Sequence, residues 1–120
     1  VLVAEDSRLN QTLAIRILQA QGHTVTVVSN GKQAVDALQY AVFDLILMDV
    51  DMPEMDGLAA TREIRALEAV VGTRIPIVAV TANNDLRACI EAGMDAYLTK
   101  PLQSKRLNQT LVSILGRTAA

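Results

Sequence analysis

Several residue types are scarce or missing in this chain of 120 residues. It has one cysteine, Cys89, so it cannot form an internal disulfide, which suits a protein of a reducing compartment. It has no tryptophan, and aromatic residues make up only 2% of the chain, too few to sandwich a flat cofactor such as a flavin. No apolar run approaches the ~20 residues that a membrane-spanning helix needs. We therefore expect a cytoplasmic location and no insertion into a membrane.

Neither sign of charge dominates the composition. The 11 Lys and Arg residues and the 13 Asp and Glu residues give a formal net charge of −2, which argues against direct binding of nucleic acid or of an anionic membrane. The length suits one domain, and a hydrophobic content of 51% is enough for a sizeable core. We expect residues 1–120 to form a single domain, excised from a longer protein because the sequence begins inside an apolar run at Val1.

Short apolar segments alternate along the chain with segments of helical periodicity. The apolar segments have the length of strands, and they occupy residues 1–4, 24–27, 45–49, 75–80 and 96–99. Polar and apolar residues alternate in segment 24–27, which predicts a half-exposed strand at one edge of the sheet. The segments between the strands have apolar residues at helical spacing, and after Gly57 the predicted buried stripe is Ala60, Ile64, Leu67 and Val71. This pattern predicts a doubly wound α/β domain whose five-stranded parallel sheet is covered by helices on both faces.

The stretch around Asp49 is the centre of the functional prediction. The apolar run from Leu45 to Met48 ends abruptly in this carboxylate, and proline, acidic residues and glycine follow. An unpaired carboxylate is very costly in a protein core. Ligands of open α/β sheets bind outside the carboxyl ends of the strands. Asp49 is therefore predicted to face other functional groups at that edge.

Parallel strands end at the same edge of a sheet, so the polar residues at the ends of four predicted strands should meet there. These residues are Glu5, Asp6, Asp49, Thr81 and Lys100. Two carboxylates ~4 Å apart repel each other by ~4 kcal/mol at an effective dielectric constant of ~20, so one is protonated or a divalent cation lies between them. A few hard oxygen ligands with room for water favour Mg²⁺. Asp49 can then act as a nucleophile toward a phosphoryl group, whose charge Lys100 and the Thr81 hydroxyl can stabilise.

These residues, in this order, resemble the response regulator receiver domain of two-component signalling. The resemblance covers essentially the whole chain and rests on four motifs: Glu5-Asp6, Asp49 with Met-Pro-Glu-Met-Asp-Gly at 52–57, Thr81-Ala82, and Lys100-Pro101. It implies a flavodoxin-like (βα)₅ fold with the strand order 2-1-3-4-5. The run from Ala4 to Ser7, with Asn10-Gln11 after it, is similar to receivers fused to hybrid histidine kinases, whose parent protein can be membrane-anchored.

The resemblance implies a role for each acid of the predicted site. Asp49 is the expected phosphoacceptor, and Asp6 and Asp49 are the expected direct Mg²⁺ ligands. The backbone carbonyl of Asp51 is a further expected ligand, and Glu5 is expected to act through water. The Asp51 side chain departs from the commonest pattern, which leaves the lifetime of the phosphorylated state open.

The resemblance also implies a switch. Thr81 is the expected switch hydroxyl, Lys100 the phosphate-binding lysine, and Tyr97 the aromatic residue that turns inward when the hydroxyl moves. The Lys100-Pro101 peptide bond is expected to be cis. The phosphoryl donor would be a phosphohistidine on a histidine kinase or on a histidine-phosphotransfer protein. The domain would catalyse its own phosphorylation and slow dephosphorylation, but its output would be a shift of the fourth helix, fifth strand and fifth helix, a face that also offers a homodimer contact.

One alternative belongs to another class. Asp49-Val50-Asp51 is similar to the nucleophile and general acid of haloacid-dehalogenase-type phosphatases, which also use Mg²⁺, a threonine and a lysine. Pro53 stands where that motif has Thr or Val, and 120 residues leave little room for a cap domain. Multiple turnover of a phosphomonoester would favour this alternative.

Overall fold

The computed structural model describes residues 1–82 and 86–115 of the chain. Within these ranges five strands alternate with five helices, in the order β1 (Leu2–Ala4), α1 (Arg8–Ala20), β2 (Thr26–Val28), α2 (Gly31–Tyr40), β3 (Ile46–Asp49), α3 (Gly57–Val71), β4 (Ile77–Thr81), α4 (Leu86–Ala92), β5 (Ala96–Thr99) and α5 (Ser104–Leu115). None of the helices in these ranges has the length and apolar character of a membrane span. Residues 116–120 of the predicted domain lie outside the described residues.

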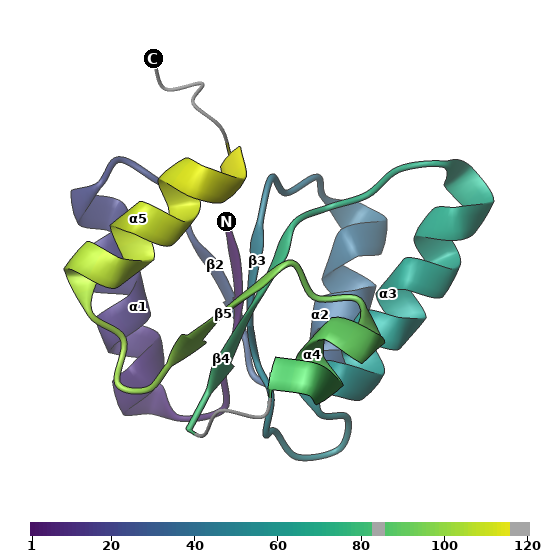
Figure 1. The fold of residues 1–120 in the computed structure, drawn as a ribbon, viewed down its shortest axis with the longest axis horizontal. Coiled ribbons are helices and arrows are strands. Elements are labelled where there is room, and N and C mark those ends of the chain that lie inside the picture. The colour runs from purple at the N-terminus through teal and green to yellow at the C-terminus, as the bar shows by residue number, and fades with distance from the viewer. Residues whose placement is uncertain (83–85, 116–120) are drawn as a thin grey trace.

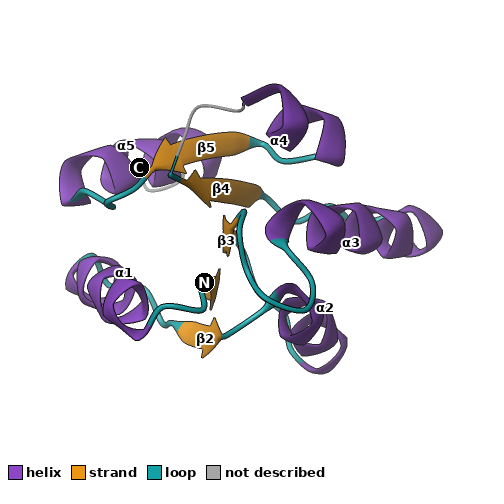
Figure 2. Cartoon of the chain, turned by 90° about the horizontal axis from the view of Figure 1, so that it is seen from below, coloured by secondary structure: helices purple, strands orange, loops and turns teal. Residues whose placement is uncertain are grey.

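The strands form one parallel sheet in the order β2-β1-β3-β4-β5, as the resemblance implied. Helices α1 and α5 cover one face, and α2, α3 and α4 cover the other (Figure 1). The view along the strands in Figure 2 shows the sheet between these two helical layers, with β2 and β5 at its edges. The prediction of a doubly wound parallel α/β fold is confirmed.

The apolar runs of the inner strands supply both sides of the core. Successive strand residues point to opposite faces, so Leu47 packs with the α1 and α5 layer and Met48 packs with the other layer. Leu18 of α1 and Leu107 of α5 are buried in the first of these cores, and Ile64 of α3 is buried in the second. Each of the three is at most 1% exposed. This double burial explains why strands β3 and β4 are apolar up to their last residues, Asp49 and Thr81, rather than alternating.

Two details of the predicted elements are wrong. The edge strand is Thr26–Val28 rather than 24–27, because the backbone of Thr26 donates to the Val1 carbonyl and sets the register with β1. In α3 the predicted buried stripe ends after Ile64, since Leu67 is 48% exposed and Val71 is 70% exposed. The helix is 15 residues long, about 22 Å, whereas β3 and β4 have only 4 and 5 residues, so its last turns extend beyond the sheet that it covers.

An arginine on α3 links three segments at the amino-terminal edge of the sheet. The Arg65 guanidinium donates to the Gly93 carbonyl (2.9 Å), the Ile75 carbonyl (2.7 Å), Glu68 (2.7 Å) and Asp95 (2.8 Å). Its side chain is only 14% exposed. The segments before β4 and β5 are therefore fixed to α3 at the edge opposite to the one where Asp49 lies.

Candidate functional site

The sheet brings the ends of four strands together as predicted. Ala4 is paired with Met48 and the chain then continues in parallel, so Glu5 and Asp6 leave β1 beside Asp49. Thr81 ends β4 next to β3, and it is paired with Thr99, so Lys100 follows at the end of β5.

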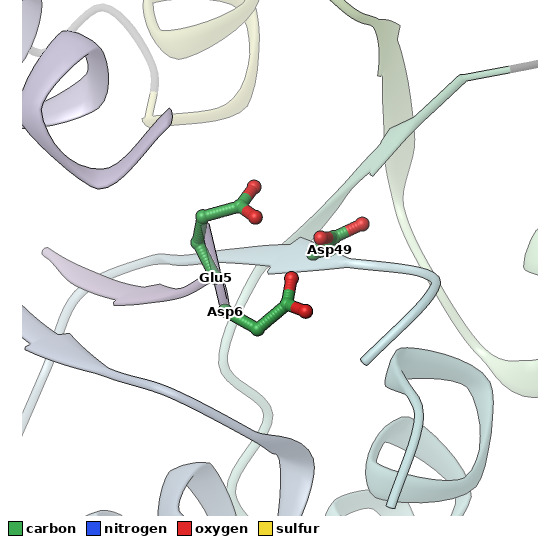
Figure 3. A group of neighbouring side chains, drawn as sticks. All are labelled: Glu5, Asp6 and Asp49. Atoms are coloured by element: carbon green, nitrogen blue, oxygen red, sulfur yellow. The ribbon is translucent and has the colours of Figure 1, made fainter. Parts of the chain in front are cut away.

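The three acids form a compact group. One carboxylate oxygen from each of Glu5, Asp6 and Asp49 lies within 4.8 Å of the others, and Figure 3 shows the side chains at the ends of the two neighbouring strands. Asp49 is 1% exposed and Glu5 is 5% exposed, whereas Asp6 is exposed to solvent. The group therefore has a buried floor, formed by Asp49 and Glu5, and one acid at its open side.

Lys100 provides the positive charge that the acids need. Its ammonium lies 2.9 Å from Asp49 Oδ2 and 3.5 Å from Glu5 Oε1. Burial lowers the pKa of Lys100, but its hydrogen bond to Asp49 and the charges of Asp49 and Glu5 outweigh burial and raise the pKa above its ordinary value. Lys100 is therefore firmly protonated at neutral pH.

Glu5 has the most unusual acidity in the site. Burial, together with the adjacent Asp49 carboxylate, raises the pKa of the Glu5 carboxyl from 4.5 to about 7, although the Ser7 N–H and the charge of Lys100 act to lower it. The Ser7 backbone N–H donates to Glu5 Oε2 (3.0 Å) and thus favours the charged form. Without a metal, Glu5 changes its protonation state near neutral pH.

The loops that leave the strands fix the position of Asp49. The backbone N–H of Asp51 donates to Asp49 Oδ1 (3.2 Å), so each oxygen of this carboxylate has a partner. The backbone N–H of Gly57 donates to the Val50 carbonyl (2.9 Å), and a Cβ at position 57 would collide with the Asp49 carbonyl oxygen. Only glycine therefore allows the start of α3 to approach β3 so closely. The Lys100-Pro101 peptide bond is cis, as predicted.

The two predicted switch residues lie on the neighbouring strands. Thr81 is 3% exposed, and its carbonyl accepts a hydrogen bond from the backbone N–H of Lys100 (2.8 Å). Tyr97 is 38% exposed on β5 and lines a shallow groove together with Leu86 and Ile90 of α4. Their movement on phosphorylation stays a prediction.

The acidic group fits a small divalent cation by its chemistry. Its donors are three carboxylates, which are hard oxygen ligands of the kind that Mg²⁺ prefers. Two oxygens bound to one Mg²⁺ lie at most about 4 Å apart. Ligation by Asp6 and Asp49 with Glu5 acting through water would leave Glu5 with its partners Ser7 and Lys100.

From the sequence we expect no role for Gln11 in the site, but the structure places it there. Gln11, in the first turn of α1, donates a hydrogen bond from Nε2 to the backbone carbonyl of Glu5 (2.6 Å). The sequence does show the Asn10-Gln11 pair just after the acids. No sequence pattern, however, predicts a hydrogen bond from a side chain to a backbone carbonyl six residues earlier.

A larger hollow lies away from the acids. It has a volume of about 750 Å³ between the end of α2 and the end of α3, and its lining is mostly apolar, with Leu38, Phe43 and Val71 among its residues. It lies at the amino-terminal edge of the sheet and none of the site residues lines it. The acidic edge, rather than this hollow, is the candidate site.

A doubly wound parallel sheet with an acidic, lysine-bridged cluster at its carboxyl edge is suited to bind a divalent cation together with a phosphoryl group. A sequence profile of the response regulator receiver domain matches residues 1–112, and the chain belongs to this family. The match decides against the haloacid-dehalogenase alternative. The chain is therefore a receiver domain of two-component signalling.

Relatives of the chain include histidine kinases by name. Sensor protein GacS of Pseudomonas syringae pv. syringae is 43% identical over 120 residues, which cover 97% of this chain and 13% of that protein. Histidine kinase 1 of Arabidopsis thaliana is 38% identical over an alignment of 155 positions, which covers 99% of this chain and 13% of that protein. The chain thus spans about an eighth of the length of these kinases.

A solved structure matches the fold. The receiver domain of sensor histidine kinase PA1611 from Pseudomonas aeruginosa PAO1 superposes with a TM-score of 0.87 at 43% identity, covering 97% of this chain and 96% of that one. That structure has a magnesium ion coordinated in its active site cleft. The receiver domain of Ssk1 from Saccharomyces cerevisiae, solved with the histidine phosphotransfer protein Ypd1, is 29% identical with a TM-score of 0.87, covering 92% of this chain and 84% of that one.

Proposed function

We propose that Asp49 accepts a phosphoryl group from a phosphohistidine on a histidine kinase or a histidine-phosphotransfer protein. The observation that carries this proposal is the position of Asp49, an acid 1% exposed at the end of β3, within 2.9 Å of Lys100 and beside two further acids. The complex of Ypd1 with the Ssk1 receiver supports the choice of donor. The domain as a whole, residues 1–120, is proposed to act as one receiver unit of a longer kinase in the cytoplasm, where Cys89 stays reduced.

The proposed transfer uses the residues already in place. An oxygen of Asp49 forms a bond to phosphorus while the phosphorus–nitrogen bond of the donor breaks and its electron pair returns to the imidazole. Lys100 pairs with Asp49 before transfer, and afterwards it can pair with a phosphoryl oxygen, because its flexible stem spans this short distance. The Thr81 hydroxyl is proposed as a donor to the same group.

Mg²⁺ is the proposed metal. Asp6 and Asp49 would hold it directly, together with the Asp51 carbonyl, and Glu5 would act through water. When bound, the ion supplies positive charge beside the transferred phosphoryl oxygens. The coordinated magnesium in the PA1611 receiver domain supports this assignment.

The proposed output is a conformational shift. Phosphorylation would bias two states of the chain through Thr81 and Tyr97 and would move α4, β5 and α5. Four exposed apolar side chains on these elements support this face as the reporting surface and as the contact of a homodimer: Leu86 (37%), Ile90 (60%), Tyr97 (38%) and Val112 (54%).

The Asp49→Asn variant tests the assignment. Incubated with a small phosphodonor and Mg²⁺, the unmodified chain should gain one phosphoryl group by intact mass, and the variant should gain none because its amide is a poor nucleophile. Asp51→Asn is the matched control, since Asp51 is a neighbouring exposed acid with no expected acceptor role, and it should still be labelled. Labelling of Asp49→Asn at another residue would refute the assignment.

A further inference from the structure

Every polar group of Glu5 has a partner. Its backbone N–H donates to the Val28 carbonyl (3.0 Å), and its backbone carbonyl accepts from Gln11 Nε2 (2.6 Å). Its carboxylate accepts from the Ser7 N–H and pairs with Lys100. Glu5 is thus fixed at both ends of its backbone.

Asp6, the next residue, has a different environment. Within residues 1–82 and 86–115, no hydrogen bond or ion pair holds the Asp6 carboxylate, which is exposed at the open side of the acidic group. The direction of its side chain therefore depends on the backbone that carries it. The Glu5 carbonyl and the Asp6 nitrogen belong to one planar peptide unit, so a bond that fixes the carbonyl also fixes the plane from which Asp6 projects.

We propose that Gln11 is a positioning residue for the metal ligand Asp6, acting through the Glu5–Asp6 peptide plane. This inference rests on the proposed Mg²⁺ site. The Gln11 amide is neutral, so it changes the site by geometry and adds no charge of its own. Partners hydrogen-bonded to metal ligands typically change metal affinity by about 10–100-fold, and Gln11 acts one peptide unit further away, so we expect an effect at the lower end of this range.

The test compares two glutamines in matching places. Gln11→Met keeps the length of the side chain and removes the donor to the Glu5 carbonyl. Gln33→Met removes a side chain-to-backbone bond of the opposite direction in the first turn of α2, where Gln33 Oε1 accepts from the Ser29 N–H (2.7 Å). We expect both variants to lower the urea midpoint to a similar degree. In calorimetric titrations with Mg²⁺ alone, Gln11→Met should bind about tenfold more weakly. Gln33→Met should bind as the unmodified chain does.

A double-mutant cycle shows whether Gln11 acts through Asp6. If it does, Gln11→Met should weaken Mg²⁺ binding far less in an Asp6→Asn background than in the unmodified chain. Equal Mg²⁺ affinity of Gln11→Met and the unmodified chain, or full additivity in the cycle, would overturn the proposal while leaving the function of Asp49 intact. An unmodified chain that binds no Mg²⁺ would overturn both.

Discussion

Lys100 is the residue that makes three neighbouring acids compatible in the absence of a metal. It pairs with Asp49, whose side chain is 1% exposed, and with Glu5, whose side chain is 6% exposed. Removal of one partner from a buried ion pair typically costs 3–5 kcal/mol, because the remaining charge has no compensation. Lys100 itself is 24% exposed, so the loss here should lie toward the lower end.

The Lys100→Ala variant should therefore lose about 2–4 kcal/mol of unfolding free energy in EDTA. Mg²⁺ should restore much of this loss, because the ion supplies the missing positive charge to the same carboxylates. Urea unfolding with and without Mg²⁺ measures both values, and the exposed Lys105→Ala is the control that should change little. A loss of the same size with and without Mg²⁺ would contradict the role of Lys100 as the resident counter-charge.

The same variant also separates acceptance from response. It should still accept some phosphoryl label at Asp49, but the amide NMR signals of α4 and β5 should no longer shift on phosphorylation. Shifts equal to those of the unmodified chain would count against Lys100 as part of the switch.

At the scale of elements, Arg65 fixes the start of β4 and the loop before β5 to α3. A Cβ at Gly93 would lie 2.9 Å from Arg65 Cγ, so the glycine leaves the space that the arginine fills. Arg74 pairs with the same Asp95 (2.7 Å), but its side chain is 59% exposed. The two arginines thus share one partner and differ in burial.

Burial predicts a large difference between the two arginines. Arg65→Met should lower the unfolding free energy by about 3 kcal/mol, since it leaves Glu68 and Asp95 without their best-buried partner. Arg74→Met should lower it by less than ~1 kcal/mol, because an exposed ion pair contributes little. Urea denaturation of both variants checks the comparison. Similar losses of unfolding free energy would show that the Arg65 contacts stabilise the fold no more than an exposed ion pair does.

The elements themselves were largely predictable, and their limits were not. Apolar runs and helical spacing predicted all five strands and the helices between them, because burial on two faces leaves a strong signature. The pattern continued through Leu67 and Val71, yet these residues are exposed, because sequence periodicity does not reveal where the sheet beneath a helix ends. The network around Arg65 was equally invisible, since it joins residues up to 30 positions apart.

On the scale of the whole molecule, stability should respond to pH through Glu5. Its pKa is about 7 in the folded chain against 4.5 for the ordinary group, so the folded state binds the proton more tightly. The contribution of Glu5 to the unfolding free energy is therefore largest below pH 4.5, and it falls as the pH rises from 4.5 through 7. The raised pKa of Lys100 acts only at alkaline pH, where stability is lost as this group deprotonates.

We expect the metal-free chain to lose on the order of 3 kcal/mol of unfolding free energy across this interval. Mg²⁺ should flatten the profile, because it favours the ionised carboxylate. Glu5→Gln should flatten the profile without metal, since it removes the titrating group. Urea midpoints from pH 4.5 to 7.5 provide the measurement, and a Glu5→Gln profile as steep as that of the unmodified chain would assign the slope to other residues.

The composition of the site was predictable for a topological reason. Parallel strands end at one edge, so Glu5, Asp6, Asp49, Thr81 and Lys100 had to come close once the strands were assigned. The sequence could not show which acid is buried or that Gln11 holds the Glu5 carbonyl, because these depend on packing and on single side-chain directions.

The bridge from Lys100 to Glu5 and Asp49 changes what metal affinity means for this domain. A divalent ion would not bind to uncompensated carboxylates, because the Lys100 ammonium already neutralises part of their charge. A dissociation constant for Mg²⁺ would therefore report an exchange between two cations, the Lys100 ammonium and the free ion. A longer or shorter tether at position 100 would retune that exchange without altering a single metal ligand.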